Sequence, residues 1–380
     1  MLNNNIYNVD ESIKKFITDE NEQALKEISS EFKQGHFTNV LSKVNSYREE
    51  AKPNDGLSEQ LNMIEAISHS QLGEPEKAAN IIETLFEQKQ SDESVVDDLL
   101  LYGQLAFLCD FKLTRKIMDH VRKQLEEQGE TNSIRLARCY TVLGEAEENL
   151  QKFPRAIKYY KQSLSIMQDH EDQEKHTVLF LHYKLGFLHS VIQDTKHAIQ
   201  YLQKAIELAE GYNEEVKINS MVSIAIMHGV QNEPEKAKAY LDEAIPLIEQ
   251  SSLKNKLVHA EAHTEMAYYY FSKSMYDEAI PHYEKISEIY KKLPTYSARK
   301  LGMAYMQYAY SLEHKEKPEK QQAGNIYEKA IEQLEKTKDR ELLQNALADV
   351  ITFFDSTNNK RKKREYENKF VEIVNGLSNR

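Results

Sequence analysis

The chain has 380 residues, of which 40% are hydrophobic and 29% are charged, with only 12 glycines and 8 prolines. So few chain-breaking residues favour helices joined by short turns and argue against a sheet-rich fold. The formal net charge of −12 argues against duplex nucleic acid as the main partner, because phosphate contacts need an excess of Lys and Arg.

The sequence lacks the apolar segments of an exported or membrane-spanning protein. No window approaches 18 uninterrupted apolar residues, and the start from Met1 to Ile6 has neither the basic region nor the apolar core of a secretory signal. Cys109 and Cys139 lie in apolar helical stretches and are too few for a disulfide framework. We therefore expect a cytoplasmic protein that has no membrane partner and keeps both thiols reduced.

The first elements in chain order are one short helix and three degenerate helix pairs. The helix is predicted over Asp10 to Thr18, and the repeats begin near Glu20. The degenerate pairs are marked by paired apolar or small positions in their first and second helices: Ile28 with Val40, Ala66 with Ala78, and Tyr102 with Thr114.

A regular array of helix pairs follows from Thr131. In the clearest pair, Tyr140 and Gly144 lie in the first helix, and Ala156 and Tyr160 lie in the second. This is the tetratricopeptide pattern, in which small residues let two helices approach closely and large ones fill the space beside that contact. The small second-helix position recurs downstream at Ala198, Ala237, Ala279 and Ala323.

The positions of the chain-breaking prolines agree with this register. Prolines fall between paired helices at Pro75, Pro154, Pro234 and Pro318. The helical segment from Glu341 to Val374 lacks the small residues and carries the basic run 360–364, as expected for the last pair of a solenoid, on which nothing stacks. The repeat is longer than the minimal unit of roughly 34 residues.

The predicted fold is therefore all-α: a right-handed superhelical solenoid of eight tetratricopeptide-type helix pairs with a C-terminal capping pair. We divide it into an N-terminal segment (1–19), degenerate helix pairs (20–130), a regular array (131–336) and capping helices (337–380). The boundary segment Glu126–Asn132 is either a hinge or only a longer loop.

First helices line the concave wall of such a superhelix, so the inward positions of these helices form the candidate binding groove. Aromatic and aliphatic side chains are unexpected on a solvent-facing wall, so their presence there calls for an explanation. Either the groove binds an apolar or amphipathic peptide, or these residues pack on one another. The predicted groove residues are Arg138, Thr141, Phe180, Tyr183, Phe187, Asn219, Val222, Glu261, Thr264, Tyr268, Phe271, Met306 and Tyr310.

The sequence predicts no catalytic residues, no metal and no cofactor. It has no Gly-rich phosphate loop and no nucleophile elbow. His259 and His263 stand four residues apart, but Ala260 occupies the place where the zinc-protease pattern has Glu. We expect a structural or solvated role for these two histidines, and the same for His182 and His189, which share a helix face.

The array from Leu136 to Phe370, with its long repeat and Tyr-rich helices, resembles the tetratricopeptide domains of Gram-positive quorum-sensing peptide receptors. That family, called RRNPP, includes the Rap response-regulator phosphatases and transcription factors that bind similar pheromones. The resemblance implies a peptide ligand in the groove. The Asn residues that hold the pheromone in the family are not matched here: Ser223 and Ile226 stand nearest, and Asn219 is displaced.

The N-terminal part departs from both branches of that family. The transcription factors carry a helix-turn-helix, for which the single helix before Glu20 leaves no room. The Rap enzymes carry a catalytic Gln just before an apolar Leu/Tyr run. The run from Asp98 to Tyr102 is similar, but Asp97 precedes it and Gln104 follows it.

Three functions remain. The leading hypothesis is a non-enzymatic regulator that binds a peptide or protein segment in its groove. The alternatives are a Rap-like response-regulator phosphatase and a constitutive scaffold. The sequence leaves open whether the chain forms a homodimer.

Overall fold

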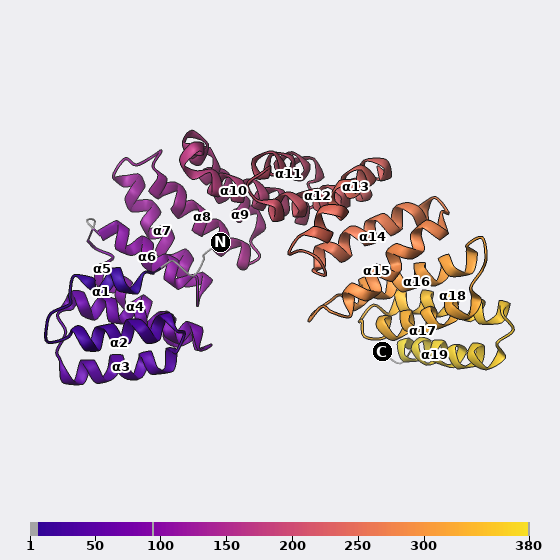
Figure 1. Ribbon diagram of the computed structural model, residues 1–380, viewed down its shortest axis with the longest axis horizontal. Coiled ribbons are helices and arrows are strands. Elements are labelled where there is room, and N and C mark those ends of the chain that lie inside the picture. Colours follow the sequence, from indigo (N-terminus) through magenta and orange to yellow (C-terminus); the bar gives the residue numbers. More distant parts are fainter. Residues whose placement is uncertain (1–6, 93–94, 379–380) are drawn as a thin grey trace. The chain divides into compact units, whose positions relative to one another are not determined.

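The computed structural model describes residues 7–92 and 95–378, and in these ranges every regular element is a helix (Figure 1). The chain divides into two compact units, Met1–Gln193 and Asp194–Arg380, which we describe separately. The helices follow the predicted order of pairs, and the division falls between the two helices of the fifth pair. The all-α repeat fold predicted from the sequence is confirmed.

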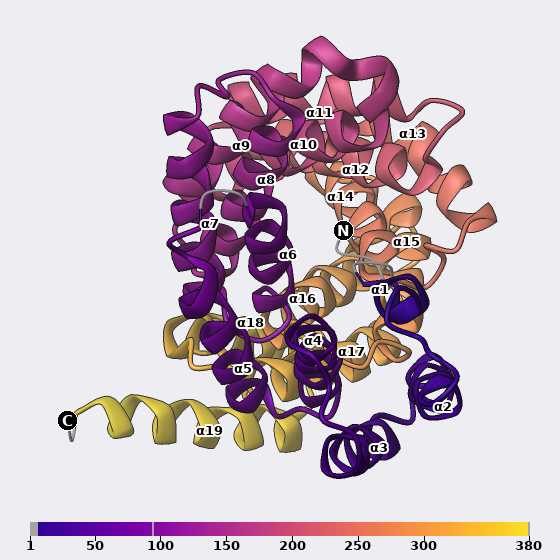
Figure 2. The same ribbon diagram turned by 90° about the vertical axis from the view of Figure 1, so that its left-hand side faces the viewer.

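The N-terminal unit contains one short helix and then antiparallel pairs, the first of which, α2 with α3, is seen nearly end-on in Figure 2. Its α-helices are α1 (Val9–Lys14), α2 (Glu22–Lys33), α3 (Phe37–Glu50), α4 (Asp55–Gln71), α5 (Pro75–Lys89), α6 (Val96–Ala106), α7 (Phe111–Glu127), α8 (Ile134–Asn149), α9 (Phe153–Met167) and α10 (Glu171–Val191). A single 3-10 turn, Gln168–His170, precedes α10.

The C-terminal unit continues the same arrangement of pairs. Its helices are α11 (Thr195–Ala209), α12 (Glu214–Val230), α13 (Pro234–Gln250), α14 (Leu257–Ser272), α15 (Tyr276–Tyr290), α16 (Ala298–His314), α17 (Lys320–Leu334), α18 (Arg340–Ser356) and α19 (Lys360–Ser378). The first helices of successive pairs touch here, since α12 contacts α14 and α14 contacts α16.

The predicted repeat register is confirmed by burial. All eight second-helix marker positions, from Val40 to Ala323, are at most 4% exposed. At the clearest pair, a methyl group on Gly144 would lie 2.6 Å from the ring of Tyr160, so only glycine allows this approach of α8 and α9. The small residues therefore set the distance between paired helices, as the pattern predicts.

Turn chemistry also follows the repeat. Pro75 and Pro234 occupy the first position of α5 and α13, where the missing N–H costs nothing. The first helix of most pairs ends at a residue with positive φ, which is glycine at Gly73 but Gln151 after α8 and Asn232 after α12. Because a left-handed residue reverses the chain, this position stops each first helix.

Two expectations are adjusted by the structure. The predicted helix from Asp10 to Thr18 ends at Lys14, because Asn21 hydrogen-bonds the backbone of Phe16 and Thr18 and holds this segment as a turn. The loop at Glu126–Asn132 separates α7 from α8, which contact each other within the N-terminal unit, whereas the division into units falls after Gln193.

The predicted capping pair is a real helix pair. Tyr366 of α19 is 3% exposed and stacks on Phe354 of α18 with ring centroids 5.6 Å apart. Of the two thiols, Cys139 is buried, as expected of a core residue, whereas Cys109 is only half-buried.

Candidate functional site

The predicted groove residues of the C-terminal unit lie on neighbouring first helices. Tyr268 on α14 is 48% exposed and Tyr310 on α16 is 39% exposed, which is high for aromatic side chains. Phe271, one turn after Tyr268, is half-buried. The structure therefore brings together residues from the seventh and eighth repeats that are distant in sequence.

An aromatic cluster forms where α14, α15 and α16 meet, and we define it as Phe271, Tyr276, Tyr310 and His314. The rings of Phe271 and Tyr276 each lie within 5.8 Å of the Tyr310 ring, both in edge-on contact. His314 stacks on Tyr310 with centroids 3.9 Å apart. These contacts restrict the orientation of Tyr310 while part of its surface stays exposed.

Two carboxylates lie beside Tyr268 on α14. Glu261 forms an ion pair with Lys300 of α16, at 3.3 Å. Burial raises the pKa of Glu265 to about 7, and its carboxylate lies against Gly229 of α12, where a Cβ would approach within 2.8 Å. This part of α14 therefore carries one carboxylate in an ion pair and one acidic group that burial holds partly in its protonated form, both near an exposed aromatic ring.

The remaining predicted residues of this unit are less available. Val222 is 1% exposed and belongs to the core between α12 and its neighbours, so its assignment to an open groove is wrong: it faces the packed side of the helix. Thr264 donates its hydroxyl to the carbonyl of Ala260, and Asn219 donates its amide to the carbonyl of Glu215. Met306 packs against the core cluster of the last repeats.

In the N-terminal unit the predicted residues separate into exposed and packed positions. Phe187 is 42% exposed and Arg138 is exposed but paired with Glu174 at 2.9 Å. Phe180 lies edge-on to Tyr160 at 6.2 Å, in keeping with the alternative in which groove residues pack on one another.

Two further predicted positions of this unit, Thr141 and Tyr183, are half-buried. The hydroxyl groups of Thr141 and Ser163 form a hydrogen bond of 2.8 Å. Phe187 is therefore the predicted aromatic residue of this unit that offers most surface to a ligand.

Gln104, the residue considered for a Rap-like phosphatase, is half-buried on α6. The nearby Asp98 forms an ion pair with Lys89 at 2.7 Å. Asp98 is thus held in a surface ion pair.

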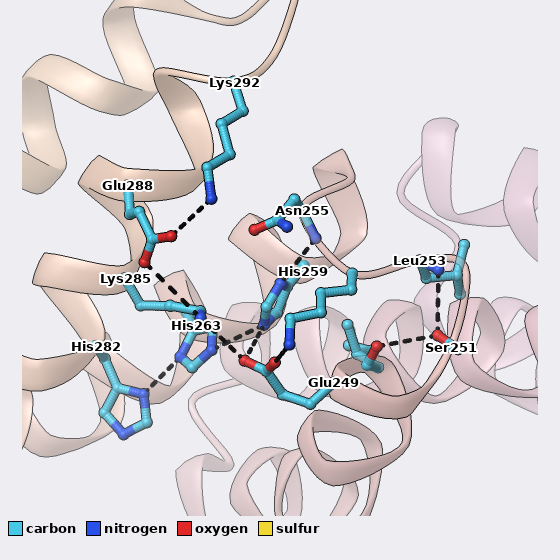
Figure 3. A network of polar contacts seen from close by, with 12 residues as sticks. Glu249, Ser251, Leu253, Asn255, His259, His263, His282, Lys285, Glu288 and Lys292 are labelled. Carbon is cyan, nitrogen blue, oxygen red and sulfur yellow. Dashed lines mark hydrogen bonds and ion pairs between the residues drawn. The ribbon is translucent and has the colours of Figure 1, made fainter.

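Sequence reasoning missed a polar cluster around His259 and His263 (Figure 3). These histidines of α14 have their Nε2 atoms 3.1 Å apart, and Glu249, near the end of α13, places Oε1 3.2 Å from Nε2 of His259. His282 of α15 lies with Nδ1 2.8 Å from Nδ1 of His263. The four-residue spacing on α14 pointed to this place, but Glu249 and His282 come from other helices and carry no sequence signal. His182 and His189, the other spaced pair, are buried.

Within the described ranges, no helix combines the length and apolar character that crossing a membrane requires.

Several solved structures share the fold of this chain. The apo form of RapI is 15% identical with a TM-score of 0.59, and the match covers 95% of this chain and 99% of RapI. The apo form of the quorum sensor NprR from B. thuringiensis is 15% identical with a TM-score of 0.53, covering 97% and 100% of the two chains. Aspartyl phosphate phosphatase F from Bacillus subtilis is 14% identical with a TM-score of 0.52, covering 94% and 95%.

A family model described as an uncharacterized protein conserved in bacteria (DUF2225) matches residues 102–225. No curated protein matches the chain. At identities of 14–15% the structural matches establish the fold and not the activity. The resemblance to Rap and NprR-type receptors predicted from the sequence is confirmed as a shared helical-repeat architecture.

Proposed function

We propose that this chain is a cytoplasmic, non-enzymatic regulator that binds a peptide or an extended protein segment on the first helices of its C-terminal unit. The observation that carries the proposal is the exposure of Tyr268 and Tyr310 on adjacent first helices, beside the aromatic cluster. Helical repeats generally act by presenting such side chains to a partner, and aromatic residues dominate binding energies.

The acidic groups beside Tyr268 indicate the chemistry of the ligand. Glu261 places a carboxylate within two turns of Tyr268 on the same helix. The chain as a whole carries a net charge of −12, so long-range attraction also favours a cationic partner. The preferred ligand is therefore an amphipathic peptide with an apolar side chain for the aromatic cluster and a basic group that replaces Lys300 as the partner of Glu261.

The structural neighbours support a signalling role. NprR is described as a quorum sensor, and this chain matches its whole length in fold. By analogy, we propose that the ligand is a short signalling peptide and that its binding shifts the population of the repeat array between two conformations.

The test uses Tyr268→Ala together with Tyr310→Ala, with Tyr212→Ala as the matched control. Tyr212 is 48% exposed, the same as Tyr268, but lies between α11 and α12. The probe is a fluorescent library of short synthetic peptides with apolar and basic residues, with binding measured by anisotropy. We expect the double variant to lose roughly 10³-fold in affinity with unchanged helicity, since two anchors of roughly 2 kcal/mol each sum to roughly 4 kcal/mol. Equal binding by the double variant and the control would refute the site.

The phosphatase and scaffold alternatives give different results. A Rap-like phosphatase releases phosphate from phosphorylated response regulators over many turnovers, and Gln104→Ala abolishes that release. A constitutive scaffold gains no thermal stability from any peptide in the library, whereas a receptor is stabilised by mass action.

A further inference from the structure

The polar cluster around His259 and His263 joins three helices of the C-terminal unit (Figure 3). Glu249 comes from α13, the two histidines from α14, and His282 from α15. One ligand atom from each of Glu249, His259 and His263 lies within 4.8 Å of the other two. His259 is fully buried and His263 is 7% exposed, whereas the side chain of Glu249 is 33% exposed. The group is thus buried on one side and open to solvent on the other.

Two of the three distances between these atoms match the edges of a tetrahedral metal site. Zinc binds imidazole nitrogen at about 2.0–2.1 Å, so two ligand atoms of a tetrahedron lie about 3.3 Å apart. Nε2 of His259 lies 3.1 Å from Nε2 of His263 and 3.2 Å from Oε1 of Glu249. The third pair, His263 and Glu249, has ligand atoms within 4.8 Å, so a cation placed between the three atoms requires side-chain movements that close this edge to about 3.3 Å.

The surroundings also supply an acceptor for the ring nitrogen of His263 that would not bind the cation. Nδ1 of His263 lies 2.8 Å from Nδ1 of His282, so it can donate its proton there, as metal-bound histidines usually do to a neighbour. The backbone N–H of Asn255 donates a 3.1 Å hydrogen bond to Nδ1 of His259, so Nε2 carries the proton in the neutral ring, and a cation at Nε2 requires the other tautomer. The side-chain Oδ1 of Asn255 is buried with no hydrogen-bond partner.

Two lysines compete with a cation for the carboxylate. Lys285 lies 3.1 Å from Oε1 of Glu249, and Lys254 lies 2.9 Å from Oε2. A divalent ion at Oε1 must displace Lys285, since like charges at this separation repel. Removing the Lys285 charge should therefore strengthen metal binding, an effect that a purely structural ion-pair network does not predict.

We propose that Glu249, His259 and His263 bind one divalent transition-metal ion of the Zn²⁺ class, with solvent as the fourth ligand on the exposed side of Glu249. Two imidazoles and one carboxylate select such ions over Mg²⁺ and Ca²⁺, which prefer oxygen ligands. The ion links α13 of the sixth repeat to α14 of the seventh and stabilises their contact. This site is separate from the proposed peptide surface, and it does not depend on that function.

The experiment uses Zn²⁺ and Co²⁺ on the full chain after chelation. The expected result is one ion per chain by calorimetry, a visible absorption spectrum of tetrahedral Co²⁺, and a rise in melting temperature that Mg²⁺ does not reproduce. The variant His259→Gln with His263→Gln should abolish all three, and Lys285→Met should tighten binding about tenfold. His36→Gln is the control, because that histidine is exposed and lies in the N-terminal unit.

Glu249→Gln covers the case in which the double histidine variant fails to fold, because it keeps the side-chain shape and should weaken binding about tenfold or more. Uptake of Zn²⁺ that is equal in wild type and Glu249→Gln overturns the proposal. So does the absence of stoichiometric uptake by the wild-type chain, and so does weaker binding by Lys285→Met.

Discussion

Replacing Gly144 by Ala tests the packing rule on which the whole repeat depends. A methyl group at this position of α8 would lie 2.6 Å from both Cδ1 and Cε1 of Tyr160, closer than real carbon atoms approach. The Tyr160 ring is fully buried, and its hydroxyl donates a 2.8 Å hydrogen bond to Glu148. The ring therefore cannot move aside without losing packing on α9 or breaking that hydrogen bond.

The size of the effect follows from two opposed terms. Overpacking a core costs roughly 1–3 kcal/mol, whereas Ala is favoured over Gly inside a helix by about 1 kcal/mol. We therefore expect Gly144→Ala to lower the free energy of unfolding by up to roughly 2 kcal/mol. Gly103→Ala is the matched control, because the three atoms nearest its methyl group belong to the unbranched, flexible side chain of Met118 and not to an aromatic ring. The control should be neutral or slightly stabilising.

Urea denaturation followed by helix circular dichroism measures both variants under the same conditions. Gly103 and Gly144 lie in first helices of the same unit, so any loss of cooperativity affects both variants alike. Equal midpoints for the two variants would show that glycine at Gly144 is not required for the contact of α8 with α9. The inferred register of small residues would then lose its physical basis.

Two further expectations follow from backbone conformation and burial. Gln151 has a φ of 58°, so Gln151→Gly should raise the free energy of unfolding by about 1 kcal/mol. The same urea titration measures this change, and a destabilised variant would contradict the assigned turn. Burial raises the pKa of the Cys109 thiol from 9.0 to about 11. Alkylation of Cys109 at pH 7 should therefore be about 100-fold slower than that of a free thiol, and it should accelerate as the pH rises towards 11. Intact-mass kinetics measure this rate, and Cys139 should react only on unfolding. Rapid modification of Cys109 at pH 7 would disprove its burial.

The fold was predicted well because the same pattern of small and large residues recurs in every helix pair. A small residue opposite a large one appears once per pair, so Ala156, Ala237 and Ala279 each test the same register. Errors at single positions do not accumulate, since every helix contacts mainly its neighbours in the chain. The turn positions were harder to predict, because Gln151 and Asn232 adopt a positive φ, a conformation that a sequence usually indicates by glycine.

The candidate binding residues were predicted less well, because helical periodicity places a residue on a face without giving its depth. Val222 and Tyr268 were assigned by the same count, yet one is 1% exposed and the other 48%. The difference arises from the neighbouring helices, which cover the Val222 side of α12 and leave Tyr268 on α14 open. Depth depends on how consecutive pairs rotate, and a single sequence contains no measure of that rotation.

The histidine cluster could not be predicted for a different reason. His259 and His263 define one face of α14, and their spacing allows two imidazoles to converge. Whether they bind anything depends on a third ligand, and Glu249 reaches them only because α13 ends beside the start of α14. Two histidines spaced four residues apart in one helix are therefore a weak signal of a metal site. The same two histidines facing a carboxylate from the preceding repeat define a metal site that can be tested. In a repeat protein, such a site between successive pairs depends on how the repeats stack, and the spacing of residues within one helix does not contain that information.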